Sequence, residues 1–518
     1  MKKNKMDKDI FLVNKAFDNQ QKNLDKWVDN ERYYNAEYEP SKLKSLKKSK
    51  RSRIFIPVTR NIVNIVKSIF SMSFFSQGCP IELIAVDDKG GEFQRKITKI
   101  IHYYYKKQKP NNELTKAFLS SLIYSMGIVF ISWNSKKDKV VTYQVPITDI
   151  AFDCDARNID DVEYVAYRFK ESQNQIVKKI KTGVYDKNAK ELIFKDDENI
   201  TQRFEIKELY IRDGNKWIYK TFCKDILLRK TTVKKIPFKW GIALERLASV
   251  DDAKREDENL VYGVSLVELI KELNDEINQK RNQKNDIQEE HINPSIIISD
   301  KTQINPADMK KGAGQRIRAK GSLDGLMFVP APNDYSLNND LPLLDKDLNE
   351  ASAVNSIQQG QTGASDRRSG TALAVVNANS TTRITNMVNL MKDTLFEHWA
   401  KEYVELVLKN ADSKVIEQLT GDKYFLGAKG NRKKIDYEIN INFGMTVDKD
   451  KKINDLMNVL LPISQNQNIN PKISERILKQ ILTMNFGEAP FLKEVFVDGE
   501  SEPLDENEQK AMKELGIS

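Results

Sequence analysis

A run without glycine or proline, from residue 264 to residue 292, constrains the fold of this chain more than any other feature. Its first half carries an apolar seam at helical spacing, formed by Val267, Ile270, Leu273 and Ile277. Beyond Ile277 the sequence is polar on every face, and Asn293-Pro294 ends the run. Such a helix, roughly 45 Å long, must bridge solvent, lie against copies of itself or fail to form.

The residues before this helix predict a mixed α/β fold in which helices come first. One helix begins beyond Pro57 and has an apolar stripe made of Ile62, Ile65, Val66, Ile69 and Phe70. A second helix is expected over 112–126, with Asn111 or Asn112 as its cap and Gly127 as its stop.

From 128 to about 240 the sequence alternates with a period of two, which predicts a mainly antiparallel sheet. The expected strands are 128–133, 140–145, 162–169, 203–212, 216–222 and 225–232. Asp213-Gly214-Asn215 has the chemistry of a hairpin turn.

The residues after the long helix predict a compact insert followed by more helices. Short strands are expected at 295–299, 315–319 and 326–329, and helices at 341–358 and 371–410, separated by a glycine- and serine-rich loop. The last of these helices has a buried face made of Ile384, Met387, Met391, Leu395, Trp399 and Tyr403. A strand at 435–443, two short amphipathic helices and an acidic tail of net charge −6 over 488–518 complete the chain.

Charge is unevenly distributed. The formal net charge is +9, and the first sixty residues hold 16 basic against 8 acidic side chains. Residues 42–60 contain eight basic residues and no acid, with the densest part formed by Lys47, Lys48, Lys50, Arg51 and Arg53. This run can contact phosphate, or it can be a solvated arm or linker.

Several classes of protein are excluded. Arg60, Asn61, Asn64 and Lys67 interrupt the most apolar region, so we expect no membrane span. The apolar run 10–13 is too short for a secretion signal. The three cysteines lack paired spacing, so we expect a reducing compartment and no zinc site. The glycines at 360, 363 and 370 are not followed by the Lys and Ser/Thr of a phosphate-binding loop, so ATP hydrolysis is not expected.

Four short motifs resemble chemical sites, and each has a structural alternative. Asp153, Asp155, Asp160 and Asp161 resemble a calcium loop, but the positions that need Gly and Glu hold Asn158 and Tyr164, which favours a surface turn. Asp252-Ala253-Lys254 matches only half of a nuclease element. Residues 102–107 interleave aromatic and basic side chains like a stacking site, although a helix end is favoured. His398 is expected to be structural.

The order of the elements resembles that of a tailed-phage portal protein, the ring-forming head-to-tail connector, of the short-tailed-virus type. The sequence-level support is concentrated in 261–294, which is similar to the descending stem helix of that family, and in 369–400. The resemblance assigns a basic N-terminal arm (1–60), an α/β wing (61–262), a descending stem helix (263–292), a clip (293–340), a returning stem helix (341–358), a tunnel loop (359–370), a long wing helix (371–410), a wing β segment (411–450), crown helices (451–487) and an acidic C-terminal tail (488–518).

The resemblance implies a homo-oligomeric ring, usually of twelve copies, at one capsid vertex of a virion and assembled in the host cytoplasm. Duplex DNA would pass through its channel during packaging and ejection. The implied partners are the major capsid protein, the terminase large subunit and tail adaptor proteins, with no membrane. We expect no catalytic residue, no metal and no cofactor.

The charge of the stem suggests how such a channel handles DNA. Residues 263–292 hold four basic and seven acidic side chains, a net charge of −3, and the expected channel residues include Glu276, Lys280, Arg281 and Lys284. An acidic wall repels DNA, so we expect grip from Arg367 and Arg368 in the tunnel loop, whose alternative role is solubilising charge. The basic arm is expected outside the narrowest part of the channel.

Two other classes of function remain open. A nucleic-acid-processing enzyme accounts for the basic balance, but it needs a metal-carboxylate or phosphate-loop site. A monomeric basic nucleic-acid-binding protein accounts for the basic arm, but it leaves the long polar helix without a partner.

Overall fold

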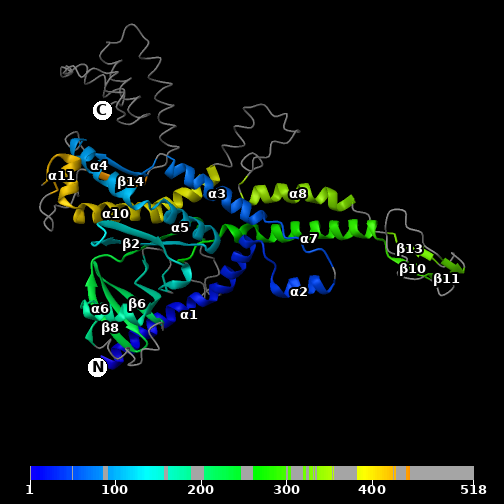
Figure 1. Cartoon of the computed structure of the whole chain (residues 1–518), viewed down its shortest axis with the longest axis horizontal. Helices are drawn as coiled ribbons and strands as arrows, with labels where there is room; N and C mark the ends of the chain where they lie inside the picture. The colour runs from blue at the N-terminus through cyan, green and yellow to red at the C-terminus, as the bar shows by residue number, and fades with distance from the viewer. Residues whose placement is uncertain are drawn as a thin grey trace, which may run out of the picture. The chain divides into compact units, whose positions relative to one another are not determined.

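The computed structural model (Figure 1) describes residues 2–49, 51–76, 78–85, 91–153, 155–156, 161–187, 203–246, 261–298, 302–304, 319–321, 326–330, 332, 335–352, 354, 382–423, 425–426 and 439–443. The chain divides into two units, one made of Met1–Phe70 with Leu83–Ile441 and the other of Ser71–Glu82 with Asn442–Ser518. Nearly all of the described residues belong to the first unit.

The mixed α/β fold class is confirmed, with long helices and two antiparallel sheets of three and five strands among the described residues. The helices of the first half are α1 (Lys2–Asn35), α2 (Pro40–Lys48), α3 (Val58–Phe75), α4 (Gly91–Gln108), α5 (Asn111–Tyr124) and α6 (Gln173–Lys181). The strands are β1 (Ile81–Ala85), β2 (Gly127–Asn134), β3 (Lys139–Gln144), β4 (Ile150–Phe152), β5 (Tyr164–Ser172), β6 (Arg203–Asp213), β7 (Lys216–Cys223), β8 (Ile226–Val233) and β9 (Phe238–Gly241).

The sheets follow from the alternation in the sequence. In the five-stranded sheet β4-β5-β6-β7-β8, neighbouring residues of one strand belong to different cores: Val165 packs with Phe152 and Trp240, and Ala166 packs with Leu209 and Phe222. The predicted hairpin is confirmed, since Asp213 pairs with Lys216 and Gly214 adopts a φ of +59°. The smaller sheet has the order β3-β2-β9.

The expected stop of the second helix is corrected. Helix α5 ends because Ser125, with a φ of +73°, takes the left-handed conformation that Gly127 was expected to supply. Gly127 instead opens β2, where an added Cβ would lie 2.2 Å from the carbonyl oxygen of Ala117. The glycine is needed for this close approach of strand and helix.

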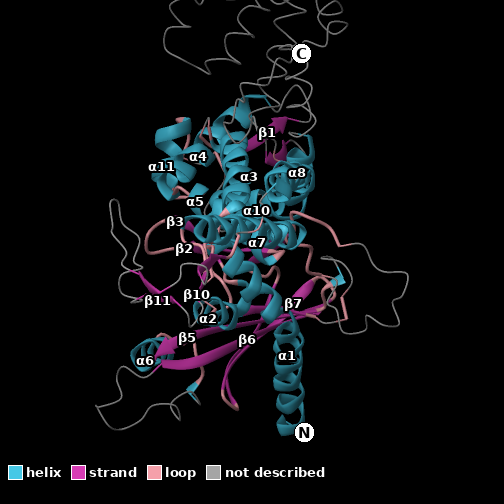
Figure 2. Ribbon diagram, turned by 90° about the vertical axis from the view of Figure 1, so that its right-hand side faces the viewer, coloured by secondary structure: helices cyan, strands magenta, loops and turns pink. Residues whose placement is uncertain are grey.

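The first half of the expected basic N-terminal arm (1–60) is a helix that packs on a sheet. Helix α1 lies along the five-stranded sheet (Figures 1 and 2), and its Val13 and Ala16 are buried there. The ammonium of Lys220 on β7 lies 2.5 Å from the carboxylate of Asp9, and both side chains are largely buried. We did not predict α1 from the sequence, although the residues that it packs in these cores recur at helical spacing: Ile10, Val13, Phe17, Leu24 and Trp27.

The second half begins with α7 (Leu266–Ile292), as expected. It continues with β10 (Ile296–Ile298), β11 (Thr302–Ile304), β12 (Ala319–Gly321), β13 (Leu326–Phe328), α8 (Tyr335–Ser352), a helical stretch over 382–391, a π-helical turn Lys392–Phe396, α10 (Glu397–Asn410), α11 (Ser413–Thr420) and β14 (Ile439–Phe443). Strand β10 pairs with β13 and β11 with β12, both antiparallel. Strands β10, β12 and β13 and helix α8 agree with the expected order of elements, whereas β11 was not expected.

Several expected boundaries change. Helix α8 begins six residues before 341, and the second strand of the insert is found at 319–321 rather than 315–319. Helix α11 was not expected. Of the strand expected at 435–443, only Ile439–Phe443 is described, as β14. The tunnel loop, the first part of the 371–410 helix, the crown helices and the acidic tail lie outside the described residues.

The buried face expected on the long helix is confirmed. Its six apolar residues, from Ile384 to Tyr403, are each at most 6% exposed. The indole Nε1 of Trp399 donates to the hydroxyl of Thr142 on β3 at 3.2 Å, and the ring of Tyr403 packs edge-on against Tyr105 on α4. Within the part of the chain that the structure describes, no helix has the length and apolarity to cross a membrane.

The buried ion pair between Asp9 and Lys220 makes the docking of α1 testable. Replacing either residue alone, by Asp9→Leu or Lys220→Met, leaves one buried charge without its partner. We expect each variant to lower the free energy of unfolding by about 3 kcal/mol. The double variant removes both charges and is expected to recover most of that loss in chemical denaturation. Additive losses in the double variant would contradict the pairing.

Candidate functional site

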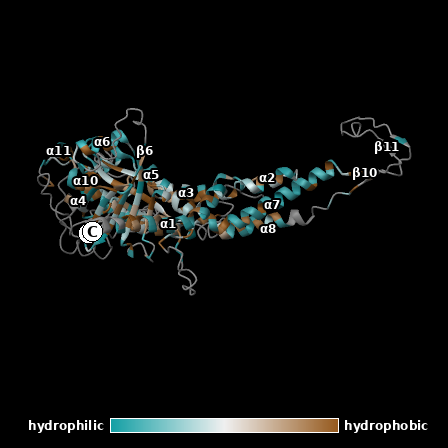
Figure 3. Cartoon of the chain, turned by 90° about the horizontal axis from the view of Figure 1, so that it is seen from below, coloured by the Kyte–Doolittle hydropathy of each residue, from teal (hydrophilic) through white to brown (hydrophobic). Residues whose placement is uncertain are grey.

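The most distinctive assembly among the described residues is a hairpin of two long helices. Helices α7 and α8 lie side by side, and β10 to β13 follow α7 at the end where the chain turns back (Figures 1 and 3). The ammonium of Lys280 on α7 lies 2.9 Å from the carboxylate of Asp340 on α8. Ile277, Leu344 and Leu348 are buried on these two helices. We call this pair of helices the stem hairpin.

A basic segment covers the side of α7 that faces away from α8. Helix α2 lies on the opposite side of α7 from α8 in Figures 1 and 3. Residues 51–57, which connect α2 to α3, form neither helix nor strand and run along α7. We call α2 together with residues 51–57 the basic cover.

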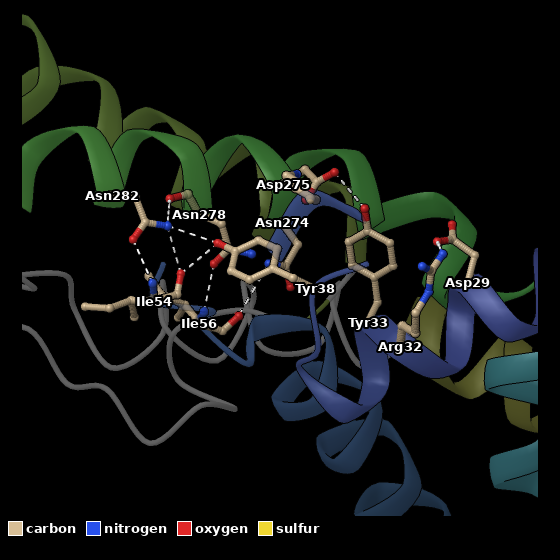
Figure 4. Close-up of polar contacts among 11 residues, drawn as sticks. Asp29, Arg32, Tyr33, Tyr38, Ile54, Ile56, Asn274, Asp275, Asn278 and Asn282 are labelled. Carbon is tan, nitrogen blue, oxygen red and sulfur yellow. Dashed lines mark hydrogen bonds and ion pairs between the residues drawn. The ribbon is translucent and has the colours of Figure 1, made fainter. Parts of the chain in front are cut away.

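Three asparagines at four-residue spacing hold the cover on α7 (Figure 4). The side-chain oxygen of Asn278 accepts from the amide of Ile56 at 2.7 Å. Asn282 accepts from the amide of Ile54 at 2.8 Å and donates to the carbonyl of the same residue at 2.8 Å. We call Asn274, Asn278 and Asn282 the asparagine ladder.

The spacing of the ladder matches that of an extended chain. Four residues of helix rise about 6 Å, and two residues of extended backbone span roughly 6.6 Å. Successive asparagines therefore meet alternate residues of the cover, Ile54 and Ile56, whose amide and carbonyl groups face the same way. The amide side chains of one helix face thus act like the edge of a neighbouring β-strand.

Both ends of the extended segment are also fixed. The carboxylate of Asp286 accepts from the amide of Ser52 at 2.6 Å. At the other end the oxygen of Asn274 accepts from the amide of Thr59 at 3.1 Å and from its hydroxyl at 2.8 Å. Since Thr59 lies in the first turn of α3, the ladder also fixes where that helix begins.

Helix α1 is held against the same helix by charged groups. The phenol of Tyr33 donates to Asp275 at 2.7 Å, and Lys42 of the cover approaches the same carboxylate at 3.3 Å. Burial and the neighbouring carboxylate raise the pKa of Tyr33, so the phenol keeps its proton and remains a donor. Lys271 pairs with Asp29 of α1 at 3.0 Å.

The polar half of α7 therefore has partners in its own chain. From the sequence we expected this half of the helix to face neighbouring copies or channel water. In the structure, residues 52–59 cover one of its faces. The net charge of −3 is unchanged when paired groups are left out, because two acids, Asp275 and Asp286, and two bases, Lys271 and Lys280, are engaged within the chain. The signal for the ladder was visible as asparagines at 274, 278 and 282, but their partners were not.

The predicted channel residues differ in their exposure and in their partners. Lys280 is paired with Asp340, and the resulting hydrogen bond raises the pKa of its ammonium. Glu276 and Arg281 are exposed, and Lys284 is half-buried. Arg367 and Arg368 lie outside the described residues.

The predicted basic residues form an exposed surface on the cover. Lys47 and Lys48 lie in the last turn of α2, and Arg51 and Arg53 follow in the extended segment. All four are exposed, and Lys50 lies outside the described residues.

The remaining motifs have structural roles where they are described. Asp153 is buried and accepts from the amide of Asp155 at 3.1 Å, as expected for a turn, while Asp160 lies outside the described residues. Among all residues that the structure describes, no group of three or more acids, histidines or cysteines could hold a metal ion. Residues 102–107 belong to the end of α4, as favoured, and Tyr104 and Tyr105 are buried. Asp252-Ala253-Lys254 lies outside the described residues.

His398 is exposed and lines a cavity of about 380 Å³. Lys235 and Lys239 line the same cavity, but their ammonium groups lie 3.4 and 3.7 Å from the carboxylate of Glu402. Their charge is therefore largely directed at a carboxylate of this chain.

Comparison with protein-family models gave no match, and comparison with curated protein sequences gave none either. The function is therefore inferred from the residues and from the arrangement of the elements.

Replacing Asn282 by Ala tests the ladder. The variant leaves the amide and carbonyl of Ile54 without their partner on α7. We expect faster hydrogen exchange over 52–56 and a loss of about 2 kcal/mol in the free energy of unfolding. Gln283→Ala, at the exposed neighbouring position, serves as the control and should change neither. Equal exchange in both variants would show that the ladder does not hold the cover.

Proposed function

We propose that this chain is a portal-type subunit, which assembles with copies of itself into a ring around a channel for duplex DNA. The observation that carries the proposal is the stem hairpin with short antiparallel strands at its turn, in the order α7, β10 to β13 and α8. This order agrees with the stem and clip expected from the resemblance to portal proteins.

The composition of the hairpin supports an assembled state. Helix α7 is about 40 Å long, and only part of its surface is buried within the chain. Leu269 on α7 and Leu343 on α8 remain 48% and 60% exposed. Polar helices with exposed aliphatic residues are typical of surfaces that meet another protein chain.

In this proposal the ring occupies one vertex of a viral capsid. It is assembled in the host cytoplasm, and its partners are the major capsid protein, the terminase large subunit and tail adaptor proteins. DNA passes through it during packaging and ejection. The subunit supplies shape and charge rather than catalysis, and the net charge of −3 over residues 263–292 favours a channel wall that does not bind phosphate.

One observation favours a second candidate, a basic nucleic-acid-binding protein that acts as a monomer. Lys47, Lys48, Arg51 and Arg53 form an exposed basic surface that can neutralise phosphates. This candidate does not account for the exposed aliphatic residues of the stem hairpin.

The copy number distinguishes the two candidates. We expect the purified chain to form closed rings of about twelve copies in native mass spectrometry and electron microscopy, because the stem hairpin leaves surface that a neighbour can bury. A stable monomer that binds duplex DNA would support the second candidate, and a monomer with divalent-dependent cleavage would support a nucleic-acid-processing enzyme.

The tunnel-loop cations give a separate test. Arg367→Ala combined with Arg368→Ala is expected to leave the rings intact but to reduce packaging or retention of DNA, since two phosphate contacts per copy are lost. Lys136→Ala with Lys137→Ala, two exposed cations in the turn between β2 and β3, is the matched control. Unchanged length and retention of packaged DNA would exclude this role for the two arginines.

A further inference from the structure

The basic cover gives one side of the stem hairpin a positive charge. Between residues 40 and 53 the described residues include six basic side chains and no acid: Lys42, Lys44, Lys47, Lys48, Arg51 and Arg53. Lys42 pairs with Asp275, and the other five are exposed. Helix α2, which carries the first four of the six, lies on the side of α7 that faces away from α8 (Figures 1 and 3).

The other helix of the hairpin exposes mainly acids. On α8 the exposed charged residues are Asp345, Lys346, Asp347 and Glu350, and Lys346 lies 3.7 Å from Glu350. On α7 the exposed Glu272 and Glu276 lie roughly a third of a turn or more from the asparagine ladder. Since α2 and α8 lie on opposite sides of α7 (Figures 1 and 3), the exposed basic residues of α2 and the exposed acids of α8 belong to elements on opposite sides of the hairpin.

Each side also exposes an aliphatic side chain. Ile54 of the cover is 51% exposed even though its backbone is held by Asn282, and Leu343 of α8 is 60% exposed. A protein surface can bury such residues, whereas the phosphates of DNA cannot. The pattern of a few aliphatic residues among charges fits a protein partner on both sides.

We propose that the basic cover of one copy docks on the acidic side of the stem hairpin of the next copy. The inference rests on the proposed ring and names the surfaces that join its members. Opposite charges on opposite sides favour a head-to-tail contact, which repeats from copy to copy and closes into a ring. A two-fold symmetric dimer through either side would instead bring like charges together.

Charge reversal tests the pairing of the two surfaces. One variant carries Lys47→Glu, Lys48→Glu and Arg51→Glu on the cover. The other carries Glu272→Lys, Asp347→Lys and Glu350→Lys on the acidic side. Each variant alone is expected to lose its rings in native mass spectrometry. Lys136→Glu with Lys137→Glu and Lys216→Glu, three exposed cations of the sheets and their turns, gives the same change of net charge as the cover variant and should keep its rings.

Mixing the two variants in equal amounts is expected to restore rings, because each altered surface then meets its complement. Such rings contain the two variants in a 1:1 ratio and an even number of copies. A single chain with all six substitutions should also assemble. Loss of rings that neither mixing nor the six-fold variant restores would overturn the pairing.

Two further outcomes separate this inference from the proposed function. If the wild-type chain forms rings and both reversal variants keep them, the named surfaces are wrong and the portal proposal stands. If the cover variant keeps its rings but binds duplex DNA less tightly than the control, the cover is a DNA-binding surface. A wild-type chain without rings would overturn both proposals.

Discussion

The hydrogen bonds between the asparagine ladder and residues 52–59 are the interaction on which the packing of α2 and α3 around α7 depends. They attach an extended segment to a helix through backbone groups, so they hold the path of the chain whatever the identity of most side chains in that segment. The beginning of α3 and the position of α2 both follow from this attachment. The bonds between α7 and α1, through Asp275 and Lys271, extend the same construction to the body that contains the sheets.

Using amides rather than aliphatic residues for this contact has a physical consequence. A buried amide gives its full stabilisation only in one register, since a shift leaves donors and acceptors unpaired at a cost of about 1–3 kcal/mol each. Even here the side-chain nitrogen of Asn278 is buried without a partner among the described residues. The cover is therefore held in a defined register along α7, which fixes the backbone positions of its charged residues.

This arrangement changes how the charge of the chain bears on the proposed function. The described basic residues before Arg60 lie on α1, on α2 and in the extended segment that is bonded to α7, and not on a detached arm. Some of them are fixed on one side of a hairpin whose other side is acidic. A net charge of +9 is then a poor guide to DNA affinity, because Lys42, Lys271 and Lys280 already pair with carboxylates of the same chain.

The sequence by itself determined the elements that depend on local pattern. The period of apolar residues predicted α3 and α7, and alternation predicted β5 to β8. Asp213-Gly214-Asn215 predicted the hairpin between β6 and β7. These signals were readable because spacing and turn chemistry act over a few neighbouring residues. Helix α1 was missed although its core residues recur at helical spacing, and the strands β4 and β9 were missed because three or four residues are too few to show a period.

Only the tertiary structure decided which polar groups meet. Asn282 and Ile54 are 228 residues apart, and Asp9 and Lys220 are 211 apart, so no local pattern links the members of either pair. The sequence shows that the asparagines of α7 need hydrogen-bond partners, but many backbone groups of the chain could supply them. Folding selects one set, because packing α1 and α3 around α7 brings residues 52–59 to that face and leaves the opposite charges on the two sides of the stem hairpin.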